Sequence, residues 1–324
     1  MTLITRLKTS VADLGRLAVG SALGLALAAA LVAAPAKAFA QAAPTPAPAA
    51  PSAVLPATGS GPALWVVKDA DSTLYLFGTI HALRPTTAWG SPKVDAAFAA
   101  ASDIYFEISN PDDQAAIISL ARQYGLGAEP LSHQITSGEL TLLDYAARAI
   151  GADAVKLDVF RPWMAGLTLS VAPLVKAGYN PASGVELILK RRAEAIGKPV
   201  HGFETVDEQI RVLATLPEEA QLEFLRSTLT SFDAASTDLD GLVAAWAAGD
   251  VATIQALGVD EMKATAPAIY EAMLTRRNAG FADDIQGLLA GSGTAFIAVG
   301  AAHLAGPDSV QAMLETRGVT VEPQ

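Results

Sequence analysis

The chain is organised around the sequence LYLFGTIH, residues 74–81. The first four residues of this stretch are apolar or aromatic, as in a short buried strand, and a glycine then precedes a histidine by three positions. Glycine at a strand end permits a sharp turn and a close backbone approach. The pattern returns as FIAVGAAH, residues 296–303, and in both copies a proline follows four residues after the histidine. We therefore predict two related strand-Gly-x-x-His units that meet in space and build one site.

The remaining chain alternates short apolar runs with helical patterns. Strands are predicted at 64–67, 73–77, 103–108, 199–203, 294–299 and 320–321. Helices are predicted at 92–101, 110–125, 138–150, 162–176, 183–196, 206–213, 217–231, 239–248, 251–257, 269–289 and 307–317. Residues 129–270 are mostly helical. The sequence thus predicts an α/β (α+β) fold, with a mixed β-sheet core from two pseudo-repeated halves and a helical insertion between them.

The first 40 residues predict a secretory signal peptide. A basic start precedes the uncharged Leu/Ala-rich run 17–34, and Ala38-Phe39-Ala40 forms a small-x-small cleavage site before Gln41. An uncleaved membrane anchor is the alternative, because the apolar run is barely long enough to span a bilayer. The Ala/Pro-rich residues 41–62 predict a disordered linker, and residues 63–324 a single domain.

Composition narrows the class of protein. The 324 residues carry a formal net charge of −11, which disfavours nucleic acid and anionic membranes as partners. The absence of cysteine excludes disulfides, thiol nucleophiles and cysteine-based zinc sites. An acidic, cysteine-free chain with a signal peptide suits the periplasm or secretion, with membrane contact only through an uncleaved N-terminus.

Four side chains at predicted strand ends suggest a metal centre. His81 and His303 follow their glycines, while Glu107 and Glu204 end two other predicted strands. Open α/β sheets place ligands at the carboxyl ends of strands, and histidine with carboxylate binds divalent cations. Such a metal can activate water and polarise a carbonyl. The alternative for each histidine alone is a core or loop residue satisfied by hydrogen bonds.

Other polar residues have simpler interpretations. His133 is predicted on a surface loop and His201 on a strand flank, while Glu186 fits a first-turn helix acid. Residues 276–278, Arg-Arg-Asn, form either a solvated helix face or a cationic clamp for an oxyanion. The chain has no His-Glu-x-x-His, Gly-x-Ser-x-Gly or phosphate-binding glycine loop, which excludes the common zinc protease, serine hydrolase and nucleotide-binding motifs.

The order of these motifs resembles the TraB/GumN family, related to the Tiki-type metalloproteases. The resemblance covers about residues 64–321. It rests on Leu-Trp-Val-Val at 64–67, Gly-Thr-Ile-His at 78–81, Phe-Glu at 106–107, Gly-Val-Glu at 184–186, Phe-Glu-Thr at 203–205, Glu-Gln at 208–209, Arg-Asn at 277–278, Val-Gly-Ala-Ala-His-Leu at 299–304 and Gly-Val-Thr-Val at 318–321.

This resemblance implies a metal-dependent hydrolase and, from the Tiki branch, a peptidase. His81, Glu107 and His303 would hold a divalent cation (Mn, Co or Zn), and Glu204, Arg277 and Asn278 would be catalytic or substrate-contacting groups. Some relatives carry a further acid shortly after the first Glu, whereas residues 108–109 here are Ile-Ser. The GumN branch, associated with exopolysaccharide gene clusters, has a far less defined chemistry.

Two functions therefore stay open. The first is a periplasmic hydrolase in which Glu204 or Glu107 is the general base for a metal-activated water, Arg277 stabilises the oxyanion, and a peptide or protein is the substrate. The second is a non-catalytic envelope protein that binds a metal complex, a haem-like ligand or a saccharide during polysaccharide or envelope assembly. A structural envelope protein, whose Gly-x-x-His pairs only pack, is a third possibility.

Overall fold

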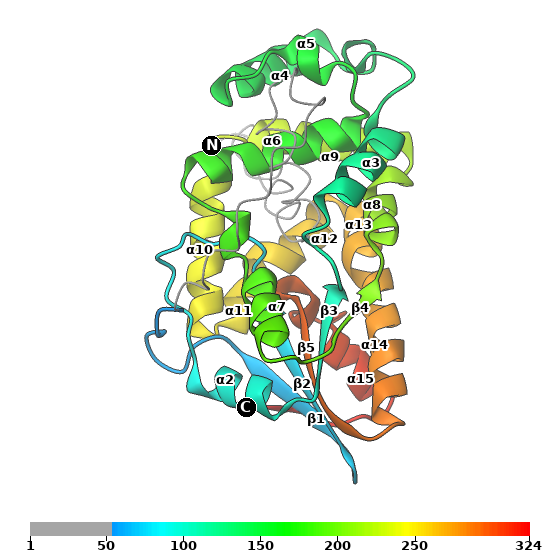
Figure 1. Ribbon diagram of the computed structural model, residues 1–324. Helices are drawn as coiled ribbons and strands as arrows, with labels where there is room; N and C mark the ends of the chain where they lie inside the picture. Colours follow the sequence, from blue (N-terminus) through cyan, green and yellow to red (C-terminus); the bar gives the residue numbers. More distant parts are fainter. Residues whose placement is uncertain (1–53) are drawn as a thin grey trace, which may run out of the picture.

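A six-stranded mixed sheet forms the centre of the computed structural model, which describes residues 54–324 (Figure 1). The predicted signal peptide and most of the predicted linker lie outside the described residues. The strands are β1 (Leu64–Lys68), β2 (Ser72–Thr79), β3 (Asp103–Ile108), β4 (Val200–Glu204), β5 (Gly293–Gly300) and β6 (Val321–Pro323), in the order β4-β3-β5-β2-β1-β6. β2, β3, β4 and β5 are mutually parallel, and β1 pairs antiparallel with β2 and β6.

The β1–β2 hairpin and the β2–β5 pair set the register of the sheet. Asp69 accepts hydrogen bonds from the backbone of Asp71 and Ser72, which closes the hairpin turn. β2 then lies beside β5, with Gly78 opposite Val299. A Cβ added at Gly78 would lie 3.1 Å from Ala301 Cα, so glycine allows the two Gly-x-x-His turns to pack closely.

Each face of the sheet has its own apolar core. Phe77, Phe106 and Phe296 face α2 (Pro92–Ala100) and α7 (Val185–Ala195). Leu76, Ile297 and Val299 face α14 (Arg276–Leu289) and α15 (Val310–Thr316). Because successive strand residues point to opposite faces, strands buried on both faces are apolar almost throughout.

The helical insertion stands over the carboxyl ends of the parallel strands (Figure 1). A separate apolar cluster, with Leu143, Leu169 and Leu225 at its centre, packs its far helices together. Besides α2, α7, α14 and α15, the helical elements of the described residues are, in chain order, α3 (Gln114–Gly125), η5 (Leu131–His133), α4 (Ser137–Ala149), α5 (Ala154–Leu157), α6 (Pro162–Lys176), η6 (Pro181–Ser183), α8 (Val206–Ala214), α9 (Glu218–Ser231), α10 (Ala235–Ala248), α11 (Val251–Ile254), η7 (Gln255–Asp260), α12 (Glu261–Thr265), α13 (Pro267–Tyr270), η8 (Glu271–Thr275) and η9 (Ala301–Leu304).

The predicted α/β class with a mixed sheet is confirmed, and the differences are local. α3 begins at Gln114 rather than at residue 110, because the side chain of Asp113 caps it by accepting from Ala116 N. The predicted helix 269–289 contains the π-helical turn η8. The pseudo-repeat stays a prediction, since His303 lies on the 3₁₀ helix η9 and His81 on no assigned helix. None of the helices within residues 54–324 has the length and apolarity of a membrane span.

Candidate functional site

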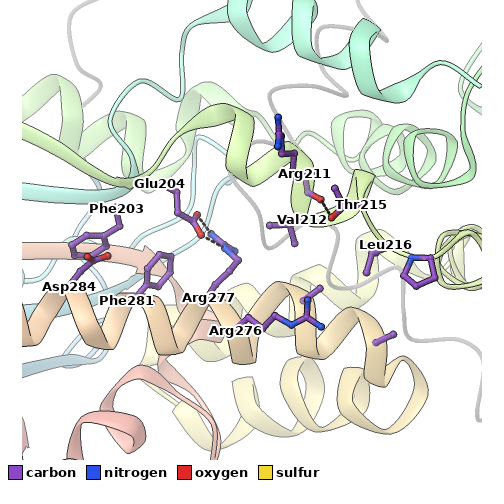
Figure 2. A pocket seen from close by; sticks show the side chains of 14 residues that line it. Phe203, Glu204, Arg211, Val212, Thr215, Leu216, Arg276, Arg277, Phe281 and Asp284 are labelled. Carbon is purple, nitrogen blue, oxygen red and sulfur yellow. Dashed lines mark hydrogen bonds and ion pairs between the residues drawn. The ribbon is translucent and has the colours of Figure 1, made fainter.

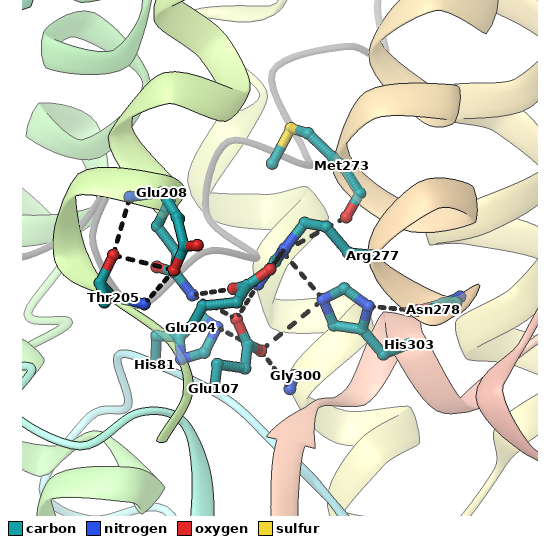
Figure 3. A network of polar contacts seen from close by, with 11 residues as sticks. His81, Glu107, Glu204, Thr205, Glu208, Met273, Arg277, Asn278, Gly300 and His303 are labelled. Carbon is teal, nitrogen blue, oxygen red and sulfur yellow. Dashed lines mark hydrogen bonds and ion pairs between the residues drawn. The ribbon is translucent and has the colours of Figure 1, made fainter. Parts of the chain in front are cut away.

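Polar side chains converge where β2, β3, β4 and β5 end together (Figure 3). His81 follows β2, Glu107 lies near the end of β3, Glu204 ends β4, and His303 follows β5 on η9. His81, Glu107 and His303 are all at least 95% buried. The helices that cover this edge therefore enclose the charged and polar groups almost completely.

Glu107 lies at the centre of this cluster. Its Oε1 accepts from Gly300 N at 2.7 Å, and its Oε2 accepts from Arg277 Nη2 at 2.5 Å and from Gln209 Nε2 at 2.8 Å. Burial raises the pKa of this carboxyl, but the Arg277 guanidinium, the two imidazoles and Gly300 N lower it well below its usual range. Glu107 is therefore a buried carboxylate anion.

Arg277 joins both strand-end glutamates. Its Nε and Nη2 donate to the two oxygens of Glu204 at 2.8 and 2.7 Å, and its Nη1 lies 3.1 Å from His303 Nε2. Burial lowers the pKa of Arg277, but Glu107 and Glu204 raise it above its ordinary value. Arg277 is thus a fixed cation, and the same Nη1 also donates to the carbonyl of Met273 in η8.

Hydrogen bonds fix the orientation of the His303 ring. Its Nδ1 lies 2.5 Å from Oδ1 of Asn278, whose Nδ2 donates to the carbonyl of Asp308 at 2.7 Å. Because the amide oxygen can only accept, the proton of the neutral ring belongs on Nδ1. Burial and then Arg277 lower the pKa of His303 to about 3, so the ring is neutral at physiological pH. Its Nε2 lone pair therefore faces the cluster.

A glutamate from α7 lies against the other ring. His81 Nδ1 lies 2.6 Å from Oε1 of Glu186, and the Thr79 hydroxyl donates to the same oxygen. α7 reaches the ring because Gly184 lies against the loop after β2: a Cβ there would be 2.3 Å from the carbonyl oxygen of His81. The Nε2 atoms of both rings then face one atom, Glu107 Oε1, at 4.0 Å for His81 and 3.6 Å for His303.

The donor chemistry of this cluster fits a divalent cation. Metal-binding histidines usually donate their other ring nitrogen to an oxygen. The His303 ring does so to Asn278, and His81 Nδ1 lies 2.6 Å from a Glu186 oxygen. In the described part of the chain no three His, Asp or Glu side chains form a ready metal cage. The Nε2 lone pair of His303 accepts from Arg277 in this arrangement, so a cation bound by His81, Glu107 and His303 would replace that hydrogen bond.

The six predicted site residues come together: His81, Glu107, Glu204, Arg277, Asn278 and His303. The sequence did not reveal two further partners, the first-turn acid Glu186 and Gln209, whose amide donates to Glu107 and Glu204. Both lie in motifs that carry the family resemblance, Gly-Val-Glu at 184–186 and Glu-Gln at 208–209, and these motifs were the signal that could have pointed to them. His201 instead pairs with Asp103, and His133 is exposed on η5.

Comparison with known proteins supports this arrangement of motifs. The family model described as the TraB/PrgY/gumN family matches residues 63–323. The chain belongs to this family. The TraB/PrgY/gumN match spans all six strands and every residue of the site.

The curated relatives have no described activity. An uncharacterized protein of Treponema pallidum (strain Nichols) is 23% identical over 284 residues, covering 78% of this chain and 80% of the relative. The uncharacterized protein YbaP of Escherichia coli (strain K12) is 24% identical over 186 residues, covering 57% of this chain and 68% of YbaP. No solved structure matches the chain significantly.

Proposed function

We propose that this TraB/PrgY/gumN family member is a periplasmic metal-dependent hydrolase that cleaves peptide bonds. The observation that carries the proposal is that the two Nε2 atoms face the Glu107 carboxylate, while Nδ1 of each ring lies within 2.6 Å of a side-chain oxygen. His81, Glu107 and His303 would hold the cation. When bound, a divalent cation polarises a carbonyl and lowers the pKa of water.

The charge of the cluster supports a cation. The cluster contains three carboxyl groups, Glu107, Glu186 and Glu204, and one guanidinium, Arg277. These four side chains carry a formal charge of −2 when the carboxyl groups are ionised. An uncompensated charge in a buried site is costly. A divalent cation would neutralise this excess.

The other side chains have roles that follow from their positions. Glu204 is the more exposed strand-end carboxylate, with its side chain 16% exposed against 3% for Glu107, so it can accept a proton from an attacking water. Arg277 presents a fixed cation beside it and can stabilise the oxyanion that forms at the carbonyl. Asn278 acts through His303, because it contacts the ring and not the open side of the site.

Metal content tests the proposal. Residues 41–324 would be purified and offered Mn, Co and Zn separately, together with His81→Ala, His303→Ala and the control His201→Ala, whose side chain is 42% exposed on β4. We expect about one ion per chain in the wild type and in His201→Ala, and none in His81→Ala or His303→Ala. Metal-dependent peptide cleavage should likewise occur only in the wild type and in His201→Ala. Absence of metal from the wild type would refute the proposal.

The hydrogen bonds of Arg277 support a second candidate function, ligand binding without turnover. Arg277 hydrogen-bonds Glu107, Glu204 and His303 at once, so these groups satisfy one another within the chain. That network favours an envelope protein that binds a ligand without turnover. Stoichiometric binding of a metal complex, a haem-like ligand or a saccharide, with no metal-stimulated hydrolysis, would select it.

A further inference from the structure

A groove lies directly beside the Glu204–Arg277 ion pair (Figure 2). It has a volume of about 500 Å³, within the range of small-ligand sites. β4 and α8 form one side of the groove, and α13, η8 and α14 form the other. Because Glu204 and Arg277 belong to both the groove and the buried cluster, a molecule in the groove has a group beside the proposed catalytic carboxylate.

The lining of the groove is largely apolar. Phe203 and Phe281 pack together at one end, with ring centroids 5.5 Å apart, and Leu216 lies toward the other end (Figure 2). Val212 and Pro217 also line the groove. Among the described residues that line it, Thr215 is the one uncharged polar side chain, and its hydroxyl donates to Arg211 O at 2.7 Å. The apolar stretches of this lining suit an apolar side chain of a ligand.

Two exposed arginines stand on opposite sides of the groove, Arg211 on α8 and Arg276 on α14 (Figure 2). Arg211 pairs with Asp207 at 2.8 Å and donates to the Tyr124 hydroxyl at 3.1 Å, and Arg276 pairs with Glu271 at 3.3 Å. Exposed pairs of this kind are weak, so each guanidinium can exchange its partner for a ligand carboxylate. The lining acid Asp284 lies at the Phe203 end, away from Leu216.

The backbone keeps the groove open at Gly280 on α14. A Cβ added at Gly280 would meet no atom within 4 Å, and the residue lines the groove. Glycine inside a helix costs about 1 kcal/mol relative to alanine. Gly287 on the same helix is equally unobstructed but does not line the groove, which provides a matched control.

We infer that the groove binds a peptide, selecting a large apolar side chain followed by an acidic group. The apolar side chain occupies the space between Val212 and Phe281, and the acidic group lies between Arg211 and Arg276. This inference names the substrate class of the proposed peptidase and rests on that function. Binding can be measured without cleavage, so the two can fail separately.

The test is calorimetric binding of three blocked dipeptides to residues 41–324 in the presence of a chelator, which prevents turnover. The probes are acetyl-Leu-Glu-amide, acetyl-Leu-Gln-amide without the charge, and acetyl-Ser-Glu-amide without the apolar side chain. We expect the first to bind about tenfold more tightly than either of the others. Failure to bind at about 10 mM, or equal affinity for all three, would overturn the inference even if the protein hydrolyses other peptides.

Variants locate the binding site. Arg211→Gln and Arg276→Gln should each weaken acetyl-Leu-Glu-amide about fivefold and leave acetyl-Leu-Gln-amide unchanged. Gly280→Leu should weaken both leucine peptides at least tenfold, while Gly287→Leu should change neither. Thermal melting of each variant verifies folding. If a glucuronate oligosaccharide binds and loses affinity in these variants while the peptides do not bind, the groove takes an acidic saccharide and the peptide assignment is wrong.

Discussion

Glu107 and His303 make this buried site sensitive to acid. Against the effect of burial, Arg277 and the other neighbours lower the pKa of Glu107, while burial and Arg277 lower the pKa of His303 from 6.5 to about 3. For both groups the unfolded chain binds protons more readily than the folded chain, so stability rises with pH. We expect the free energy of unfolding of the metal-free protein to fall from about pH 6.5 to about pH 3, first through His303 and below about pH 5 also through Glu107.

Urea unfolding of Glu107→Gln across this pH range checks the contribution of the carboxylate. The amide keeps the shape but leaves Arg277 with one carboxylate fewer, so we expect a loss of about 3 kcal/mol at pH 7 and a flatter pH dependence below pH 5. The control is Asp103→Asn on the same strand, where the exposed pair with His201 should contribute less than about 1 kcal/mol. An unchanged slope in Glu107→Gln would assign the acid sensitivity to other groups.

Glu186 should control metal affinity through His81. Glu186→Gln replaces the carboxyl group that lies 2.6 Å from Nδ1 of the ring, and loss of such a neighbour typically weakens metal binding 10- to 100-fold. Competition with a chromophoric chelator measures the change. Glu194→Gln on the same helix changes an exposed acid and should leave the affinity unaltered. Equal affinities of the two variants would show that Glu186 does not act on the metal centre.

The proximity of the six residues could be predicted from the sequence because each belongs to a recognisable motif near a strand end or on the last long helix, while their roles stay predictions. The sequence could not predict that Glu186 contacts His81. A first-turn acid stabilises a helix wherever that helix lies, and only the packing of α7 against the loop after β2 brings this one to the ring. The contact of Gln209 depends in the same way on where α8 lies beside β3 and β4.

At the level of elements, apolar periodicity predicted most strands and helices within a few residues. It did not predict the π-helical turns η7 and η8, because one extra residue in a turn hardly alters the apolar pattern. η8 directly precedes Arg276, so it helps to set the direction from which Arg277 and Asn278 enter the site. The order of the strands in the sheet could not be predicted either, because an apolar run does not indicate which strands it pairs with.

Gly184 should be essential for the contact between α7 and the His81 loop. In Gly184→Ala the methyl group would clash with the carbonyl oxygen of His81, 2.3 Å away, so α7 must shift. We expect a loss of about 2 kcal/mol in urea unfolding, together with weaker metal binding. Gly138→Ala is the matched control, since its nearest contact is 3.9 Å away in the first turn of α4. Wild-type stability in Gly184→Ala would mean that this packing tolerates a side chain.

For the whole molecule, the fold joins distant parts of the chain into one site. His81 and His303 come from opposite ends of the described chain, and the β2–β5 pairing places them at one sheet edge. The insertion supplies α8 on one side of the groove, and α14 returns along the other side. Truncation past His81 or before His303 would therefore remove a proposed metal ligand, so a test of the site needs both halves of the sheet.

The N-terminal residues predict where the molecule acts. The basic start, the apolar run and the Ala38-Phe39-Ala40 segment predict export with cleavage before Gln41. In a Gram-negative host we expect the periplasmic fraction to contain a chain whose intact mass corresponds to residues 41–324. The double substitution Ala38→Leu and Ala40→Leu should block cleavage and retain the protein in the membrane fraction, whereas Gln41→Asn should be processed normally. A wild-type chain of full mass in the membrane fraction would instead indicate an anchored protein, with its site held at the membrane surface.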